Sequence, residues 1–100
     1  MVNGDSMRPT LRAGDLCLVV WGVRIRSGDV VVARLPDRPL GVKRAVRRTP
    51  DGWWLEGDDP AASTDSRTFG AVPADAVLGR VLIRYWPPAR RPVLVRRLAT

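Results

Sequence analysis

Lys43 is the residue whose type points most directly to chemistry. It is the one lysine among 17 basic residues, and the other 16 are arginines. A lysine amine buried among apolar neighbours loses its proton more easily, because burial disfavours the charged form, whereas arginine stays protonated. Lys43 follows Val42 in an expected strand, so a neutral amine there would be able to act as a general base. A lysine that points to water is the alternative that the strand alone leaves open.

Ser6 is the candidate nucleophile. It follows Gly4-Asp5 and precedes a possible helical turn over residues 6–12, which Pro9 keeps short. A serine at such a junction presents its hydroxyl beside backbone N–H groups that can hold an oxyanion. Taken alone, the same position is equally that of a helix cap, which is the simpler interpretation.

Two scarce residue types exclude several classes of site. The chain has no histidine, which excludes Ser-His-Asp and Cys-His catalysis and every metal site that contains histidine. Cys17 is the one cysteine, so neither a disulfide within the chain nor a zinc site of several thiolates can form. We therefore expect no metal and no cofactor.

The net charge of +7 raises the question of a nucleic-acid partner. The arginines are scattered along the chain, and no ladder of aromatic residues runs between them, as a binder of single strands would need. We expect a solvated arginine-rich surface and no nucleic-acid partner. A basic binding module without enzymatic activity is kept as an alternative.

The elements that must position these residues are short strands. One hundred residues make one domain, for which we expect residues 1–86, followed by a Pro/Arg-rich tail at 87–100. Apolar or alternating runs between Gly, Pro and Asp predict a mainly β fold with one or two short helical turns. The expected strands are residues 16–21, 29–34, 41–47, 53–56 and 77–86, with a hairpin turn at Asp51-Gly52. Residues 6–12 and 73–76 are the expected helical turns, residues 58–70 form a long loop, and 93–98 are either a last strand or part of a mobile tail.

The chemical motifs occur in one order along residues 2–86. They are Gly4-x-Ser6-Met7-x-Pro9-Thr10-Leu11, Gly14-Asp15, Gly28-Asp29-Val30-Val31, Val42-Lys43-Arg44, Gly57-Asp58-Asp59 and Ser63-x-Asp65-Ser66-Arg67-x-Phe69-Gly70. This series resembles the type I signal peptidase family of serine–lysine peptidases. It is most similar to the short soluble members associated with maturation of nickel-type superoxide dismutase, through residues 52–70 and Arg84-Tyr85-Trp86-Pro87.

The resemblance implies a role for each matching residue. Ser6 matches the nucleophile, Lys43 the general base, and Ser63 the second serine that orients the lysine amine. Asp65 and Arg67 match a buried pair that braces the loop of the active site. The implied β fold is that of signal peptidases and repressor-type peptidases.

The substrate would lie extended along an exposed strand edge, with small side chains before the cut. We expect the substrate-binding residues to be Met7, Val30, Val31, Val32 and Ala33. Two positions depart from the family pattern: Gly4 lacks the hydroxyl that some members use as a second oxyanion donor, and Asp59 replaces the usual asparagine.

The expected function is that of a serine endopeptidase that removes an N-terminal leader from a precursor, with a nickel-type superoxide dismutase precursor as the first candidate. The longest apolar run, Leu16–Val23, is too short for a membrane span, and no signal peptide is found, so we expect a cytoplasmic enzyme. A general signal peptidase-like processing enzyme is an alternative. A self-cleaving repressor-type peptidase is another, but only residues 1–5 precede Ser6, and they offer no site for self-cleavage. The oligomeric state stays open.

Overall fold

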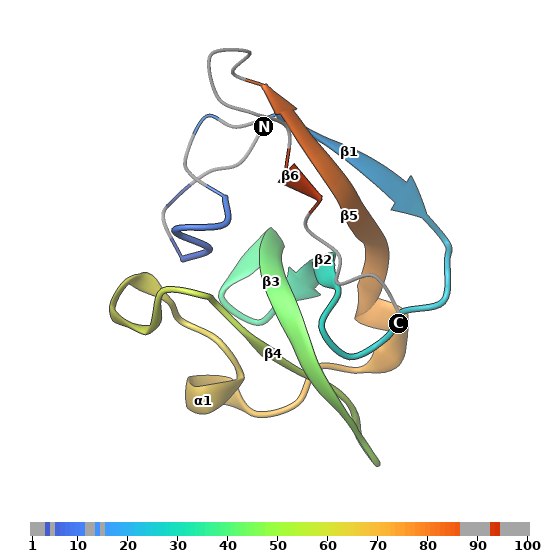
Figure 1. The fold of residues 1–100 in the computed structure, drawn as a ribbon. Coiled ribbons are helices and arrows are strands. Elements are labelled where there is room, and N and C mark those ends of the chain that lie inside the picture. Colours follow the sequence, from blue (N-terminus) through green and yellow to red (C-terminus); the bar gives the residue numbers. More distant parts are fainter. Residues whose placement is uncertain (1–3, 5, 12–13, 15, 87–92, 95–100) are drawn as a thin grey trace.

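The chain folds around one antiparallel sheet, as the computed structural model shows (Figure 1). The structure describes residues 4, 6–11, 14, 16–86 and 93–94. The sheet has six strands in the order β1-β5-β2-β3-β4, and β6 pairs with β5 outside this path. The predicted mainly β fold is confirmed. The strands are β1 (Leu16–Trp21), β2 (Val30–Leu35), β3 (Arg38–Thr49), β4 (Gly52–Glu56), β5 (Val77–Trp86) and β6 (Val93–Leu94).

Two tight connections determine the lengths of the central strands. β2 and β3 join across two residues, with Leu35 opposite Arg38, so β3 begins three residues earlier than predicted. β3 and β4 form the predicted hairpin, with Thr49 opposite Gly52. Gly52 has a φ of 134°, a conformation that side chains disfavour, so glycine suits this turn.

The long loop at residues 58–70 contains helical turns that the sequence analysis did not predict. η1 spans Pro60–Ala62 and α1 spans Ser66–Phe69. An aspartate caps each of them: Asp59 accepts a hydrogen bond from the N–H of Ala61, and Asp65 accepts one from the N–H of Arg67. The third helical turn, η2 (Ala74–Ala76), lies within the predicted residues 73–76.

Two apolar clusters lie on the two faces of the sheet. Val31, Ala33 and Leu35 belong to one cluster, and Val30 and Val32 belong to the other, because successive residues of a strand point to opposite faces. The first cluster continues through Ala45, Trp53, Leu55, Val72 and Ala76. The second contains Val81 and the buried side chains of Met7 and Leu11, which therefore anchor the turn that carries Ser6.

The predicted substrate edge at Val30–Ala33 is wrong. β2 pairs with β3 on one side and, through Val31, Val32 and Ala33, with β5 on the other. Its backbone groups are therefore already engaged. β3 has an unpaired side near the site, because β4 pairs only with residues from Arg44 to Thr49, which leaves one side of residues 38–43 without a neighbouring strand among the described residues. The end strands β1 and β4 also have one outer side each without a neighbouring strand in the described part of the sheet.

The C-terminal region returns to the sheet. Val93 pairs with Arg84, and Leu94 pairs with Ile83, which places a short strand within the predicted range 93–98. The rest of the predicted tail lies outside the described residues. No helix in the described part of the chain is long and apolar enough to cross a membrane.

Candidate active site

Lys43 is buried in the middle of β3. It lies opposite Val31, on the face of the first apolar cluster, and only 2% of the residue is exposed. Its Nζ donates a hydrogen bond of 3.0 Å to Ser63 Oγ. Burial lowers the pKa of the Lys43 amine, and the positive charge of Arg38 lowers it further, while the negative charge of Asp65 opposes both. A solvent-exposed lysine, the alternative left open by the sequence, is not what the structure shows.

Ser63 connects Lys43 to a carboxylate. The Ser63 hydroxyl donates to Asp65 Oδ2 at 2.7 Å, which leaves its oxygen free to accept from the Lys43 amine. Asp65 is buried and also accepts the Gly57 N–H at 2.8 Å. Arg67 completes the chain with bonds of 2.5 and 3.0 Å to the two carboxylate oxygens.

Asp65 is held in its ionised form by these donors. Burial alone would raise the pKa of this carboxyl group. The hydrogen bonds from Arg67, Gly57 and Ser63 outweigh burial and hold the pKa well below its usual range. An ionised Asp65 can only accept hydrogen bonds, so the Ser63 proton must point toward it.

The turn that carries Ser6 lies next to this series of hydrogen bonds at Gly57. The N–H of Asp59 donates to the Ser6 carbonyl oxygen at 2.7 Å, and Figure 1 shows the N-terminal turn beside this loop. A Cβ at Gly57 would lie 2.6 Å from that carbonyl oxygen and closer still to Ser63 Oγ. The absence of a side chain at Gly57 therefore lets the Ser6 turn and the Ser63 loop approach each other. No hydrogen bond joins Ser6 to Lys43 among the described residues.

A second polar network, which the sequence analysis did not assign, ties the Ser6 turn to β3. Arg44 binds Asp58 through two bonds, of 3.1 Å and 2.7 Å, and donates to the Gly28 carbonyl at 2.8 Å. Thr10 Oγ1, four residues after Ser6, donates to the same Asp58 carboxylate at 2.6 Å. Arg44 and Asp58 lie in two of the sequence motifs, and their opposite charges are the feature of the sequence that points to this pair.

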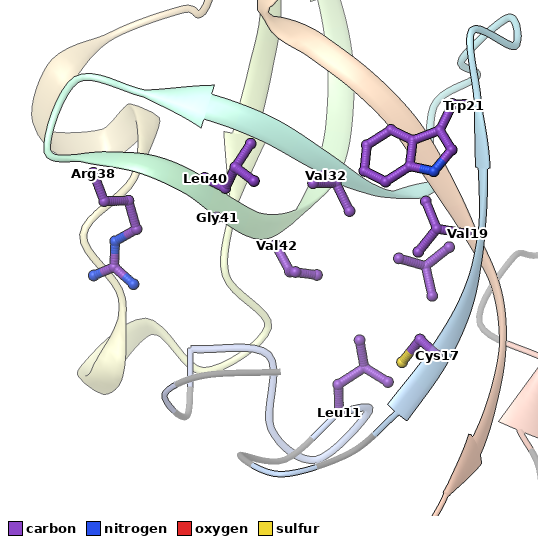
Figure 2. Close-up of a pocket in the computed structure, with 10 residues that line it drawn as sticks. Leu11, Cys17, Val19, Trp21, Val32, Arg38, Leu40, Gly41 and Val42 are labelled. Atoms are coloured by element: carbon purple, nitrogen blue, oxygen red, sulfur yellow. The ribbon is translucent and has the colours of Figure 1, made fainter. Parts of the chain in front are cut away.

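A cavity of about 300 Å³ lies on the other face of β3 from Lys43 (Figure 2). β3 contributes Val42, which alternates with Lys43 along the strand. The lining is mostly apolar, with Cys17, Val19 and Trp21 from β1 on the opposite side. The remaining lining residues are Leu11, Val32, Arg38, Leu40, Gly41 and Val81.

Of the five residues predicted to bind substrate, only Val32 lines this cavity. Val30, Val31 and Ala33 have no exposed surface, and Met7 is 1% exposed. All four pack in the apolar clusters of the core. The unbroken apolar run of residues 30–33 reflects burial on both faces of the sheet.

Comparison with known proteins agrees with the geometry. The profile of a family described as Peptidase S24-like matches residues 1–82. The chain belongs to this family of peptidases. This Peptidase S24-like chain is 37% identical to mitochondrial inner membrane protease subunit 1 of Xenopus tropicalis, over 85% of the chain and 66% of that protein. It is 36% identical to mitochondrial ATP-independent inner membrane protease subunit 1a of Arabidopsis thaliana, over 87% of the chain and 69% of that protein.

The Peptidase S24-like chain thus spans about two thirds of the length of these relatives (66% and 69%). Their names confirm the peptidase part of the resemblance, and they do not mention nickel-type superoxide dismutase. The predicted cytoplasmic location is wrong, because these relatives are named as proteases of the mitochondrial inner membrane.

Proposed function

We propose that the chain is a serine endopeptidase that uses a Ser6–Lys43 dyad to remove an N-terminal leader from a precursor protein. The observation that carries the proposal is the buried Lys43 amine, which donates a hydrogen bond to Ser63. Further hydrogen bonds continue from Ser63 to Asp65 and from Asp65 to Arg67. A buried lysine is costly for a protein, so a role that needs a neutral amine explains why it is there.

The reaction begins when the neutral Lys43 amine takes the proton of the Ser6 hydroxyl as Ser6 Oγ attacks the scissile carbonyl. The oxyanion that forms accepts hydrogen bonds from backbone N–H groups near Ser6. The protonated Lys43 then gives its proton to the leaving amine, and the peptide bond breaks. A water molecule attacks the acyl-enzyme with Lys43 as base again, which releases the leader and restores Ser6.

Ser63 and Asp65 act on Lys43 without touching the substrate. One N–H of the amine is directed to Ser63, which leaves the nitrogen lone pair free to point elsewhere. The negative charge of Asp65 stabilises the ammonium form that exists during the reaction, whereas burial favours the neutral form that starts it. The two opposing influences suit an amine that must both accept and release a proton.

The leader would pair with the unpaired side of β3 at residues 38–43. This position replaces the β2 edge that the sequence analysis had predicted. An extended peptide places alternate side chains on one face, so the residue before the cut would pack against Val42 and the cavity (Figure 2). The apolar lining favours small apolar side chains there, as the resemblance also implies.

The substrate that we propose first is the precursor of a nickel-type superoxide dismutase. This part rests on the likeness in residues 52–70, a segment that includes Gly57, Ser63 and Asp65. The ligands of that nickel enzyme include the N-terminus created by trimming, so the cut would be coupled to formation of its metal site.

The test is to incubate the purified chain with a leader-bearing precursor and identify the new N-terminus by mass spectrometry. We expect one cut at the leader boundary, unchanged by a chelator, and no cut with Ser6→Ala or Lys43→Arg. Cleavage of a secretory signal peptide without cleavage of the dismutase leader would replace the proposed substrate but keep the peptidase. Unchanged activity in Lys43→Arg would reject the dyad, and a basic binding module predicts that this substitution is harmless.

A further inference from the structure

The outer edge of β4, on the side away from β3, is bound by groups of residues 63–72 and by no further strand in the described part of the chain. The outward N–H groups belong to alternate residues, because the hydrogen bonds of a strand alternate between its two sides. The Trp53 N–H donates to the Val72 carbonyl at 2.8 Å. The next outward N–H, that of Leu55, donates to the Ser66 side chain, with 2.8 Å between N and Oγ. Ser66 Oγ thus takes the place that a carbonyl of a neighbouring strand would occupy.

The following outward N–H ties the same loop to the lysine site. The Gly57 N–H donates to Asp65 Oδ2 at 2.8 Å, and that oxygen also accepts the Ser63 hydroxyl at 2.7 Å. Ser63 in turn accepts from the Lys43 amine. Asp65 directly precedes Ser66, so two consecutive residues bind two successive outward N–H groups of β4. The loop is therefore fixed on this strand at two points, one of which leads to Lys43.

The Ser66 hydroxyl is a buried polar group that no step of the proposed reaction uses. Ser66 is 1% exposed and Leu55 has no exposed surface. Ser66 is also the first residue of α1, and the preceding Asp65 caps this helix. Without the hydroxyl, the Leu55 N–H would lose its acceptor in a buried position, where an unsatisfied donor is unfavourable. The loop would then have to move to satisfy it, and Asp65 would move with it.

We propose that Ser66 is a positioning residue for the general base. Its hydrogen bond with the Leu55 N–H fixes residues 63–70 on β4. The fixed loop holds Ser63 against the Lys43 amine. The inference rests on the proposed function and extends it to a residue that lies one hydrogen-bonded strand position away from the bonds around the lysine.

The first measurement is the hydrogen bond itself. Ser66→Ala removes only the side-chain oxygen, so hydrogen exchange followed by NMR should become faster at the Leu55 amide. The Trp53 amide, which donates to a backbone carbonyl, should keep its protection. Ser66→Cys keeps a weaker acceptor and should give intermediate exchange, which also provides a comparison if the alanine variant does not fold. The matched control is Thr68→Ala, because Thr68 is an exposed hydroxyl residue in the same helix.

The second measurement reads the lysine directly. Lys43 is the one lysine of the chain, so isotope-labelled lysine gives a single side-chain signal whose titration reports its pKa. Burial is the largest cause of the lowered pKa, and a loosened loop admits water to the amine. The pKa should therefore move up toward 10.5 in Ser66→Ala and stay unchanged in Thr68→Ala. The charged groups that act on this amine are those of Asp37, Arg38, Asp65 and Arg67.

The third measurement is the kinetics on a leader peptide. In Ser66→Ala, kcat should fall about 3- to 10-fold with KM nearly constant, the range that one net hydrogen bond gives. Faster exchange at Leu55 with an unchanged Lys43 pKa and full kcat would overturn the positioning role. A fall in kcat that only matches the unfolded fraction seen by circular dichroism would overturn it too. If the native chain cuts no leader peptide, the proposed function fails, while the exchange and the titration still decide whether Ser66 positions Lys43.

Discussion

Lys43 Nζ lies 3.0 Å from Ser63 Oγ, and the same hydroxyl donates to Asp65. The amine thus has a directed partner that is itself held by an ionised, buried carboxylate. This arrangement sets the orientation of the amine without using the lone pair that a base needs.

Ser63→Ala should slow the reaction while leaving substrate binding nearly unchanged. The variant removes the acceptor that orients Lys43, and a hydrogen bond to a charged group is worth about 1.5–3 kcal/mol, so kcat should fall roughly 10- to 100-fold with KM almost constant. Steady-state kinetics on a leader peptide measure both values. Ser27→Ala, at an exposed serine, is the control. A Ser63→Ala enzyme with full kcat would show that Lys43 needs no orientation.

The rate should rise with pH as Lys43 loses its proton. Because burial lowers the pKa of this amine, the rise should be centred below the ordinary lysine value of 10.5. The profile of kcat/KM for a leader peptide, measured on the free enzyme, reports this pKa. A flat profile between about pH 6 and 10 would contradict the role of Lys43 as base.

Lys43→Met should make the folded protein more stable at neutral pH, although it abolishes activity. Because the pKa of Lys43 is lowered in the folded protein, the unfolded chain binds the proton of this amine more tightly than the folded chain does. The native lysine therefore destabilises the fold at pH values below 10.5. The gain should be largest at neutral and lower pH and should shrink as the pH approaches 10.5. Urea unfolding at several pH values measures it. A loss of stability in Lys43→Met at pH 7 would show that the amine is not destabilising.

Asp65→Asn should destabilise the protein at neutral pH by about 1–3 kcal/mol, because the buried Gly57 N–H and the Arg67 guanidinium group lose their charged acceptor. The lowered pKa of Asp65 means that its contribution is present above the ordinary value of 3.8 and is lost as the pH falls below it. The difference between the variant and the native protein should therefore shrink in acid. Asp75→Asn, at an exposed aspartate, should change stability little at any pH. An equal loss at pH 3 and pH 7 would exclude this ionic contribution.

Asp58→Ala should reduce both activity and stability, because Asp58 joins Thr10 of the Ser6 turn to Arg44 of β3. Arg44, which is partly buried, would lose the Asp58 carboxylate that it binds, at a cost of about 1–3 kcal/mol. The midpoint temperature of thermal unfolding and kcat should both fall. Asp51→Ala in the exposed hairpin turn should change neither. Loss of stability with full activity would show that the network does not position Ser6.

Several features could be predicted from the sequence alone, because they depend on neighbouring residues. Strand alternation and the Gly, Pro and Asp residues between runs correctly predicted β1, β5 and the hairpin that leads to Gly52. The single lysine and the absence of histidine restricted the possible general bases to very few groups. The order of the motifs was enough to indicate a peptidase family.

Only the tertiary structure decided which strands are neighbours and which polar groups meet. The apolar run Val30–Ala33 is equally suited to an edge or a central strand, and pairing with both β3 and β5 made it central. The approach of the Ser6 turn to Ser63 depends on the missing side chain of Gly57, and no local pattern reveals that contact. The Arg44–Asp58 bonds join residues 14 positions apart. Such contacts are set by the packing of the whole sheet, because the free energy of each depends on partners that the chain brings together only when it folds.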